Sequence, residues 1–312
     1  MSTINWFPGH MHKARKEIAE VMPHMDVVIE VIDARIPFSS ENPLVPSLRG
    51  NKPLIKLLNK SDLADPAITQ LWVEKMEQET GVKAIPVTTQ RPDQIRALLN
   101  AAVSLVSERQ REVRPARAMI MGIPNVGKST ILNTIAGRVI AKTGNEAGVT
   151  KAQQKIKMDN GVLLTDTPGF LWPKLSPPSC GYRLAITGAI KDTVFDYADI
   201  ALYAAEYLKD AYPQALKDRY KLSELPETDI EILDAIGVSR GASRKGGGVD
   251  LQKVSNLLIN DIRSGALGTI SWETPEMTTR EVEEDRIAEE KRKQEKAERD
   301  EIRRLKTKKN RR

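Results

Sequence analysis

The sequence predicts an α/β fold with a doubly wound sheet, followed by a smaller all-helical domain and a charged tail. In the first half, short runs rich in β-branched residues alternate with polar helical stretches, the pattern of a parallel sheet with helical crossovers. After Phe170, three prolines interrupt the chain and a helical pattern follows. From Thr279 onward, Glu, Lys and Arg dominate, and apolar residues are too few to pack against a core. We therefore expect boundaries at residues 1–172, 173–278 and 279–312.

Hydrophobic periodicity places the elements of the first half. Helical spacing is expected over residues 68–80 and 94–110, with an apolar stripe on the second segment. The runs between them are short and apolar, as buried strands are. The expected strands are Val27–Ile32, Pro53–Leu58, Ala84–Val87, Ala118–Met121, Lys155–Met158 and Val162–Thr165.

The second half is expected to begin with a linker at Pro173 and to continue as helices. Those helices are predicted over residues 189–210, 212–220, 228–236 and 250–264. Residues 239–248, rich in Arg, Lys and Gly, are either a flexible loop or a basic loop that contacts phosphate. The tail is either a frayed helix or a disordered arm, and its acid-free end at 303–312 favours contact with RNA.

Composition limits the class of protein. A chain of 312 residues can bury a core without disulfides, and the single Cys180 cannot form one within the chain. The sequence offers neither a signal-peptide core nor a long apolar span, so we expect a cytoplasmic protein without a membrane partner. The formal charge of +6 and pI near 9.2 favour a polyanionic partner. The aromatic content of 4% favours backbone contacts over base stacking.

The strongest motif is the octapeptide GIPNVGKS at residues 122–129. It follows an expected strand and precedes an expected helix over Thr130–Ala136, the context that a phosphate-binding loop (P-loop) requires. Glycines let successive backbone amides face phosphate oxygens, and the helix adds the positive end of its dipole. Lys128 would reach the β- and γ-phosphates, and the Ser129 hydroxyl would bind Mg²⁺. The expected nucleotide contacts are Asn125, Val126, Gly127, Lys128, Ser129 and Thr130.

Two further segments complete the phosphate site. Asp166, at the end of an apolar strand, opens the sequence DTPG and would hold Mg²⁺ through water. The amide of Gly169, which ends that sequence, would sense the γ-phosphate. Thr150, in a loop rich in Gly, Asn and Thr, is the candidate first switch whose hydroxyl joins the Mg²⁺ shell.

Base identity is expected to depend on the sequence NKSD at residues 59–62. The Asp62 carboxylate can accept two hydrogen bonds from guanine, whereas adenine offers no such donor pair. Asn59 would bond the opposite edge of the base, and the stem of Lys60 would pack on its face. Thr88, in the segment after the third strand, would supply a final backbone contact. A P-loop with a guanine reader predicts a P-loop GTPase that binds GTP and GDP with Mg²⁺.

The order of these motifs is circularly permuted, because the guanine reader precedes the P-loop, whereas ordinary GTPases place it last. Moving the termini leaves the sheet unchanged if the old ends lie close together. The chain also passes from the DTPG segment directly into the helical domain. A movement near Gly169 that depends on the γ-phosphate can therefore reach that domain.

These motifs, with WFPGHM at residues 6–11 and DARIP at 33–37, resemble the circularly permuted GTPases of the bacterial ribosome biogenesis GTPase A family up to about Trp272. The resemblance implies assembly of the large ribosomal subunit, GTPase activity stimulated by that particle, and a helical domain that contacts rRNA. We expect no DNA partner and a monomer when free. The resemblance also implies that His10 orients the attacking water, because Phe170 stands where small GTPases carry a glutamine. The alternative is that ribosomal RNA supplies the missing group. Asn125 resembles an asparagine that helps related enzymes bind K⁺.

Two rival functions remain open from the residues. One is an RNA-binding assembly factor whose nucleotide site is only structural. The other is a GTPase that acts on another RNA, such as tRNA, or on membranes. GTP turnover with and without large subunits separates the first rival from the GTPase hypothesis. The absence of an amphipathic anchor and of a cysteine motif for RNA modification argues against the second.

Overall fold

A computed structural model describes residues 4, 9–97, 114–141, 154–158, 161–242, 244 and 248–309. For residues 9–14, 301–302 and 304–309 it describes the backbone alone. Residues 1–274 form one compact unit, and residues 275–312 form a second. No helix in the described segments is both long and apolar enough to cross a membrane.

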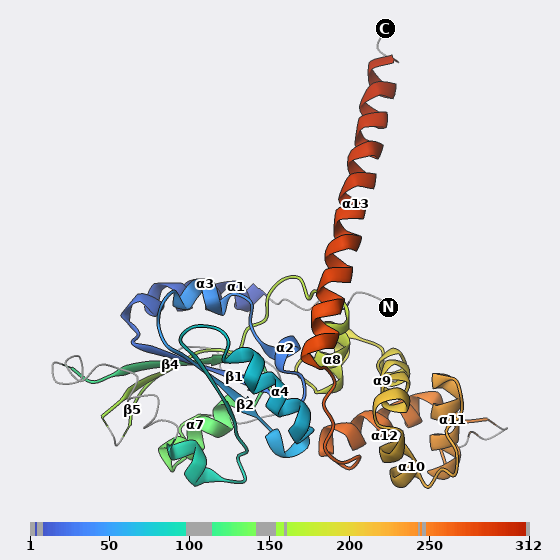
Figure 1. The fold of residues 1–312 in the computed structure, drawn as a ribbon, viewed down its shortest axis with the longest axis horizontal. Helices are drawn as coiled ribbons and strands as arrows, with labels where there is room; N and C mark the ends of the chain where they lie inside the picture. The colour runs from blue at the N-terminus through green and yellow to red at the C-terminus, as the bar shows by residue number, and fades with distance from the viewer. Residues whose placement is uncertain are drawn as a thin grey trace. The chain divides into compact units, whose positions relative to one another are not determined.

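Among the described residues, six strands form one sheet in the order β3-β2-β1-β4-β6-β5 (Figure 1). The first five in this order are parallel, and β5 pairs antiparallel with β6 at the edge. The expectation of a doubly wound α/β sheet is confirmed, with the addition of this antiparallel edge strand. The strands are β1 Val27–Asp33, β2 Leu54–Asn59, β3 Val82–Pro86, β4 Arg117–Gly122, β5 Gln154–Lys157 and β6 Leu163–Asp166.

Helices flank the sheet, and α1 and α3 lie on one side of it while α7 lies on the other (Figure 1). Every residue of β1 and β2 is buried, which is why both strands are nearly continuous apolar runs. The helical turns in this part are α1 Gly9–Val21, η1 Met22–His24, α2 Pro37–Ser40, α3 Val45–Arg49, η2 Ser61–Leu63, α4 Pro66–Met76 and α7 Lys128–Ala136. The helix expected over 94–110 lies largely outside the described residues.

The helical region is built around α9, which packs against α8, α10, α11 and α12. Its elements are α8 Ser179–Ile186, η3 Asp192–Val194, α9 Tyr197–Ala211, α10 Pro213–Tyr220, α11 Asp229–Ser239 and α12 Leu251–Ser264. Three of the expected helices are found near their predicted bounds. The helix expected from residue 189 instead begins at Tyr197, after the short turn η3.

Helix α8 is an element that the sequence did not lead us to expect. Its residues are all buried, and it begins directly after Pro177 and Pro178. We interpreted these prolines as helix breakers, but a proline is tolerated at the start of a helix, where its missing N–H would have no partner. The chain therefore continues here as a buried helix, which packs against α2, α9 and α12.

A buried ion pair of the helical region contacts the helices that follow β1 and β2. Arg183 of α8 lies 3.3 Å from Glu273, and both side chains are fully buried. Glu273 also accepts hydrogen bonds from the backbone and hydroxyl of Ser39, next to β1. Its own carbonyl accepts from the Trp72 indole at 3.1 Å. Elements far apart in the sequence thus share one hydrogen-bonded centre.

The second unit is described by itself as one helix, α13 Pro275–Lys309. The sequence left a helix or a disordered arm open for most of this segment, and the structure has the helix. Side-chain pairs three and four residues apart, such as Arg286 with Glu283 and Glu290, support it locally.

Candidate nucleotide-binding site

The carboxyl ends of the parallel strands bring polar residues to one edge of the sheet. β1 ends at Asp33, β2 at Asn59 and β6 at Asp166, and Asp33 pairs in register with Asn59. The P-loop leaves the same edge from Gly122, at the end of β4. Ligands of open α/β sheets bind outside this edge. The strand order therefore gathers motifs that lie more than a hundred residues apart.

The P-loop connects β4 to α7, as the sequence predicts. Its Gly127 has φ +92°, and a Cβ atom there would lie 2.2 Å from the Asn59 amide nitrogen. Glycine is required because the NKSD segment approaches the loop closely at this point. The N-terminus of α7 begins at Lys128, so its free amides face the loop.

Lys128 and Asp166 form a loose buried pair in the centre of the site. Their charged atoms are 3.9 Å apart, and each side chain is almost completely buried. Neither carboxylate oxygen of Asp166 accepts a hydrogen bond within the described structure. Burial raises the pKa of Asp166 and lowers the pKa of Lys128. The Asp166 carboxylate is therefore incompletely satisfied, and it has acceptor capacity to spare for a cation or its water.

The NKSD segment contacts the backbone of the P-loop directly. The Asn59 amide donates to the Val126 carbonyl at 2.7 Å. The Lys60 ammonium donates to the Asn125 carbonyl at 2.9 Å. The structure therefore brings together the two motifs on which the sequence prediction rested.

Asp62 and Thr88 lie together beside this contact. The Asp62 side chain is exposed, and one of its oxygens accepts from the Gln90 amide at 2.9 Å. Ser61 donates from its backbone and its hydroxyl to the Val87 carbonyl, which joins the NKSD segment to the segment after β3. The hydroxyl of the next residue, Thr88, accepts a hydrogen bond from the backbone N–H of Gln90.

A carboxylate that our sequence analysis did not assign to the site holds Lys60 in place. Asp33 accepts from the Lys60 ammonium at 2.8 Å, and from Arg35 through two guanidinium nitrogens at 2.9 and 2.8 Å. Although burial by itself raises its pKa, Arg35 and Lys60 hold the pKa of Asp33 well below its usual range. The sequence signal was the DARIP segment, which we used only for the family resemblance.

The remaining expected residues are placed unequally. Gly169 lies against the P-loop, because a Cβ there would be 3.0 Å from the Pro124 nitrogen. The Asn125 amide donates to the Gly188 carbonyl at 2.8 Å, which links the P-loop to the helical region. Ser129 and Thr130 lie in the first turn of α7. Thr150 lies outside the described residues, and His10 lies in α1 with its side chain outside the described part.

Comparison with known proteins identifies the family. The family model described as 50S ribosome-binding GTPase matches residues 117–294, which begin at β4 and leave the NKSD segment upstream. Ribosome biogenesis GTPase A of Priestia megaterium is 45% identical over 281 residues, covering 88% of this chain and 97% of that protein. The chain belongs to the ribosome biogenesis GTPase A family. It is therefore a GTPase, which hydrolyses GTP to GDP and phosphate.

Solved structures and a distant relative agree with this family. Ribosome biogenesis GTPase A of Thermotoga maritima is 30% identical, with 88% of this chain and 96% of that protein covered. A GDP-bound YlqF structure covers 83% of this chain and 99% of its own, at 28% identity and a TM-score of 0.61. A GNP-bound YlqF structure from T. maritima covers 85% and 99%, also at 28% identity, with a TM-score of 0.60. Proteins of this GTPase family have thus been solved with guanine nucleotides bound.

We predict that Asp33→Asn lowers the affinity of the protein for GDP about tenfold or more. The Lys60 and Arg35 cations would lose a charged acceptor, and charge-assisted hydrogen bonds contribute about 1.5–3 kcal/mol each. Calorimetric titration with GDP measures the change.

Asp26→Asn is the matched control for this prediction. Asp26 precedes β1 at its other end and forms a two-pronged pair with Arg114, so it has the same chemistry away from the P-loop. We expect its GDP affinity to stay within about twofold of the parent protein. Equal losses in the two variants, or no loss in Asp33→Asn, would contradict the positioning role of Asp33.

Proposed function

We propose that this GTPase binds the immature large ribosomal subunit in its GTP-bound state and leaves after hydrolysis, late in assembly of that particle. The family description and the names of the relatives support this function. The observation that carries it is the pair of hydrogen bonds from Asn59 and Lys60 to the P-loop, because they bring a guanine reader to a phosphate site. The protein would work in the cytoplasm as a monomer when free.

The phosphate end of the site fits GTP with Mg²⁺. The buried, unpartnered oxygens of Asp166 would hold the ion through water, with the Ser129 hydroxyl and, from the sequence, Thr150. Mg²⁺, when bound, neutralises charge on the β- and γ-phosphates. Lys128 would take the same phosphates, and the amides of Gly127 and α7 would surround them. Water then attacks the γ-phosphorus in line, and GDP leaves with the opposite oxygen.

We expect Asp62→Asn to lower the affinity for GTP at least 100-fold and to raise the affinity for xanthosine triphosphate relative to that for GTP. Guanine offers two donors to the carboxylate, whereas an amide replaces one acceptor by a donor and so matches the carbonyl of xanthine. Competition titration of both nucleotides measures the preference. Gln90→Ala is the control, since it removes the described partner of Asp62 but leaves the carboxylate. An unchanged guanine preference in Asp62→Asn would exclude Asp62 as the base reader.

Turnover of GTP with and without purified large subunits tests the function itself. We expect slow turnover alone, because no arginine finger is evident from the sequence, and at least tenfold stimulation by the particle. His10→Ala should remove most of the stimulation if this side chain orients the water. His24→Ala, which changes an exposed histidine of η1, is the matched control. A lack of stimulation in the parent protein would favour the rival RNA-binding factor with a structural nucleotide site.

Asn125 supports a proposal that K⁺ assists hydrolysis. Its amide nitrogen donates to Gly188, and this bond orients the side chain, whose oxygen is the kind of ligand that K⁺ takes. We expect faster hydrolysis in KCl than in NaCl at equal ionic strength, and no such difference in Asn125→Ala. Equal rates of the parent protein in the two salts would rule out the role of K⁺.

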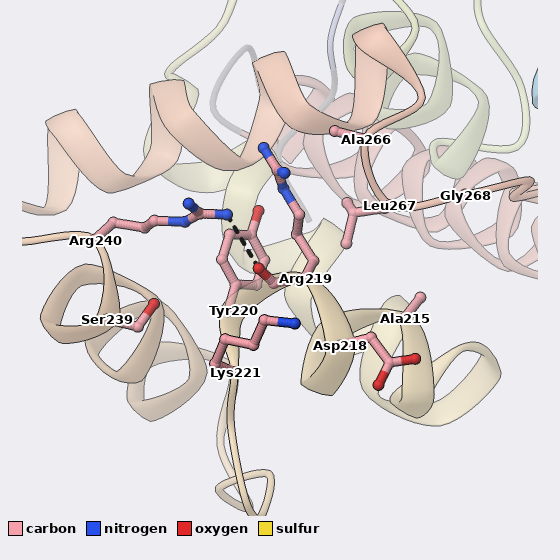
Figure 2. A pocket seen from close by; sticks show the side chains of 10 residues that line it. All are labelled: Ala215, Asp218, Arg219, Tyr220, Lys221, Ser239, Arg240, Ala266, Leu267 and Gly268. Carbon is pink, nitrogen blue, oxygen red and sulfur yellow. Dashed lines mark hydrogen bonds between the residues drawn. The ribbon is translucent and has the colours of Figure 1, made fainter.

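A cavity in the helical region supports the proposal that this part contacts rRNA. The cavity has a volume of about 800 Å³ and is lined by the C-terminal ends of α10 and α11 and the turn after α12. Lys221 and Arg240 are exposed beside it, and Arg240 lies over the Tyr220 ring while donating to the Arg219 carbonyl (Figure 2). Exposed cations at the mouth of a cavity fit backbone phosphates of RNA.

A further inference from the structure

Residues 291–300 of α13 form an exposed helical segment without an apolar face. All described side chains from Lys291 to Asp300 are exposed, as is Arg303. Among residues 291–309 the apolar ones are Ala297, Ile302 and Leu305, too few for the repeating seam of a coiled coil. The same shortage excludes a helix that inserts an apolar face into a membrane surface. Any partner of this segment must therefore be recognised mainly through charge.

The segment also carries the net positive charge of the whole protein. Residues 291–312 contain twelve basic and four acidic residues, a net charge of +8, whereas the whole chain has +6. The first 290 residues are therefore net −2. We define residues 291–312 as the arm. A polyanion is attracted over long range by the net charge of the arm and not by the net charge of the rest of the chain.

Within the arm, basic residues follow one face of the helix. Arg292, Lys296, Arg299 and Arg303 succeed one another at spacings of four, three and four residues, so they share a face over roughly 17 Å. The sequence continues this spacing at Lys306. Of the acids of the arm, Glu298 and Glu301 lie on other faces of the helix, whereas Glu295 and Asp300 flank the stripe on its two sides. A cation near a helix C-terminus also stabilises its dipole, but that effect is confined to the last turn and does not explain a stripe of this length.

We propose that this basic stripe binds RNA phosphates and tethers the GTPase to the RNA surface of its particle without reading sequence. The proposal rests on the proposed function for the identity of the RNA. Arginine and lysine on one face can track a line of phosphates, and the aromatic-free stripe provides no platform for bases. The match to the family model ends at residue 294, so most of the arm lies beyond the segment that the family model covers.

The test compares two variants that lose the same charge from the full-length protein. The stripe variant carries Arg292→Gln, Lys296→Gln, Arg299→Gln and Arg303→Gln. The matched control carries Lys291→Gln, Lys293→Gln, Arg304→Gln and Lys308→Gln, which lie off the stripe. Glutamine keeps a helix propensity close to that of Lys and Arg, and circular dichroism checks that both helices persist.

Affinity for a 20-base-pair RNA duplex of arbitrary sequence is measured by titration over a series of salt concentrations. We expect the stripe variant to bind at least tenfold more weakly near physiological salt. The slope of log K against log salt concentration should become shallower by about three to four, which is about one unit for each lost phosphate contact. The control should keep at least half of the parent slope. A second duplex of different sequence should bind equally well.

Three results would overturn the proposal. These are equal losses in the two variants, unchanged binding by the stripe variant, and binding of the arm to vesicles with anionic lipids in preference to RNA. GTP turnover without RNA should be the same in both variants and the parent, since no substitution touches the nucleotide site. If large subunits fail to stimulate the parent protein, the function proposed above is wrong, while the duplex titration still decides whether the arm binds RNA.

Discussion

Two hydrogen bonds set the geometry of the nucleotide site, from Asn59 to the Val126 carbonyl and from Lys60 to the Asn125 carbonyl. They hold the NKSD segment in direct contact with the P-loop. A side chain at position 127 would collide with the Asn59 amide, so this position requires glycine. The sheet makes this contact possible, since β1 lies between β2 and β4 and all three end at the same edge. Chain order is irrelevant to such a contact, which explains how a permuted sequence retains the site. Asp33 then extends the contact by anchoring Lys60 from the strand between the two motifs.

Most strands of the sheet and the P-loop could be predicted from the sequence, because each is marked by a pattern within one short segment. Buried strands appear as apolar runs, and the P-loop has a spacing that few other structures require. The ion pair of Asp33 with Lys60 was missed because it depends on the distance between neighbouring strand ends, which no single segment encodes. Helix α8 was missed because Pro177 and Pro178 disfavour a helix interior while permitting a helix start. The roles assigned to the site residues, Thr150 and His10 among them, stay predictions.

The P-loop also contacts the region that follows it in the chain. Asn125 donates to Gly188, and Gly169 packs against Pro124, so the loop touches both the DTPG segment and the turn after α8. Phe170, the residue after Gly169, is buried, and its carbonyl accepts from the Asn42 amide at 3.3 Å. The C-terminal end of the DTPG segment is therefore held in place by the burial and hydrogen bond of Phe170. A displacement there has short mechanical routes into α8 through packed and hydrogen-bonded atoms.

The hydrogen bonds between Ser39 and Glu273 limit how the helical region can respond to the nucleotide. Arg183 and Glu273 both belong to that region, whereas Ser39 belongs to α2, so moving the helices away from the sheet would break the two bonds that Ser39 donates to the buried carboxylate. Hydrogen bonds to charged groups contribute about 1.5–3 kcal/mol each, and a hinge would have to meet that cost at every cycle. Sliding of α8 by an ångström or so, with these bonds intact, is the cheaper motion. The enzyme should therefore change the shape of its surface by shear, and a partner that senses its state must detect small shifts across a broad face.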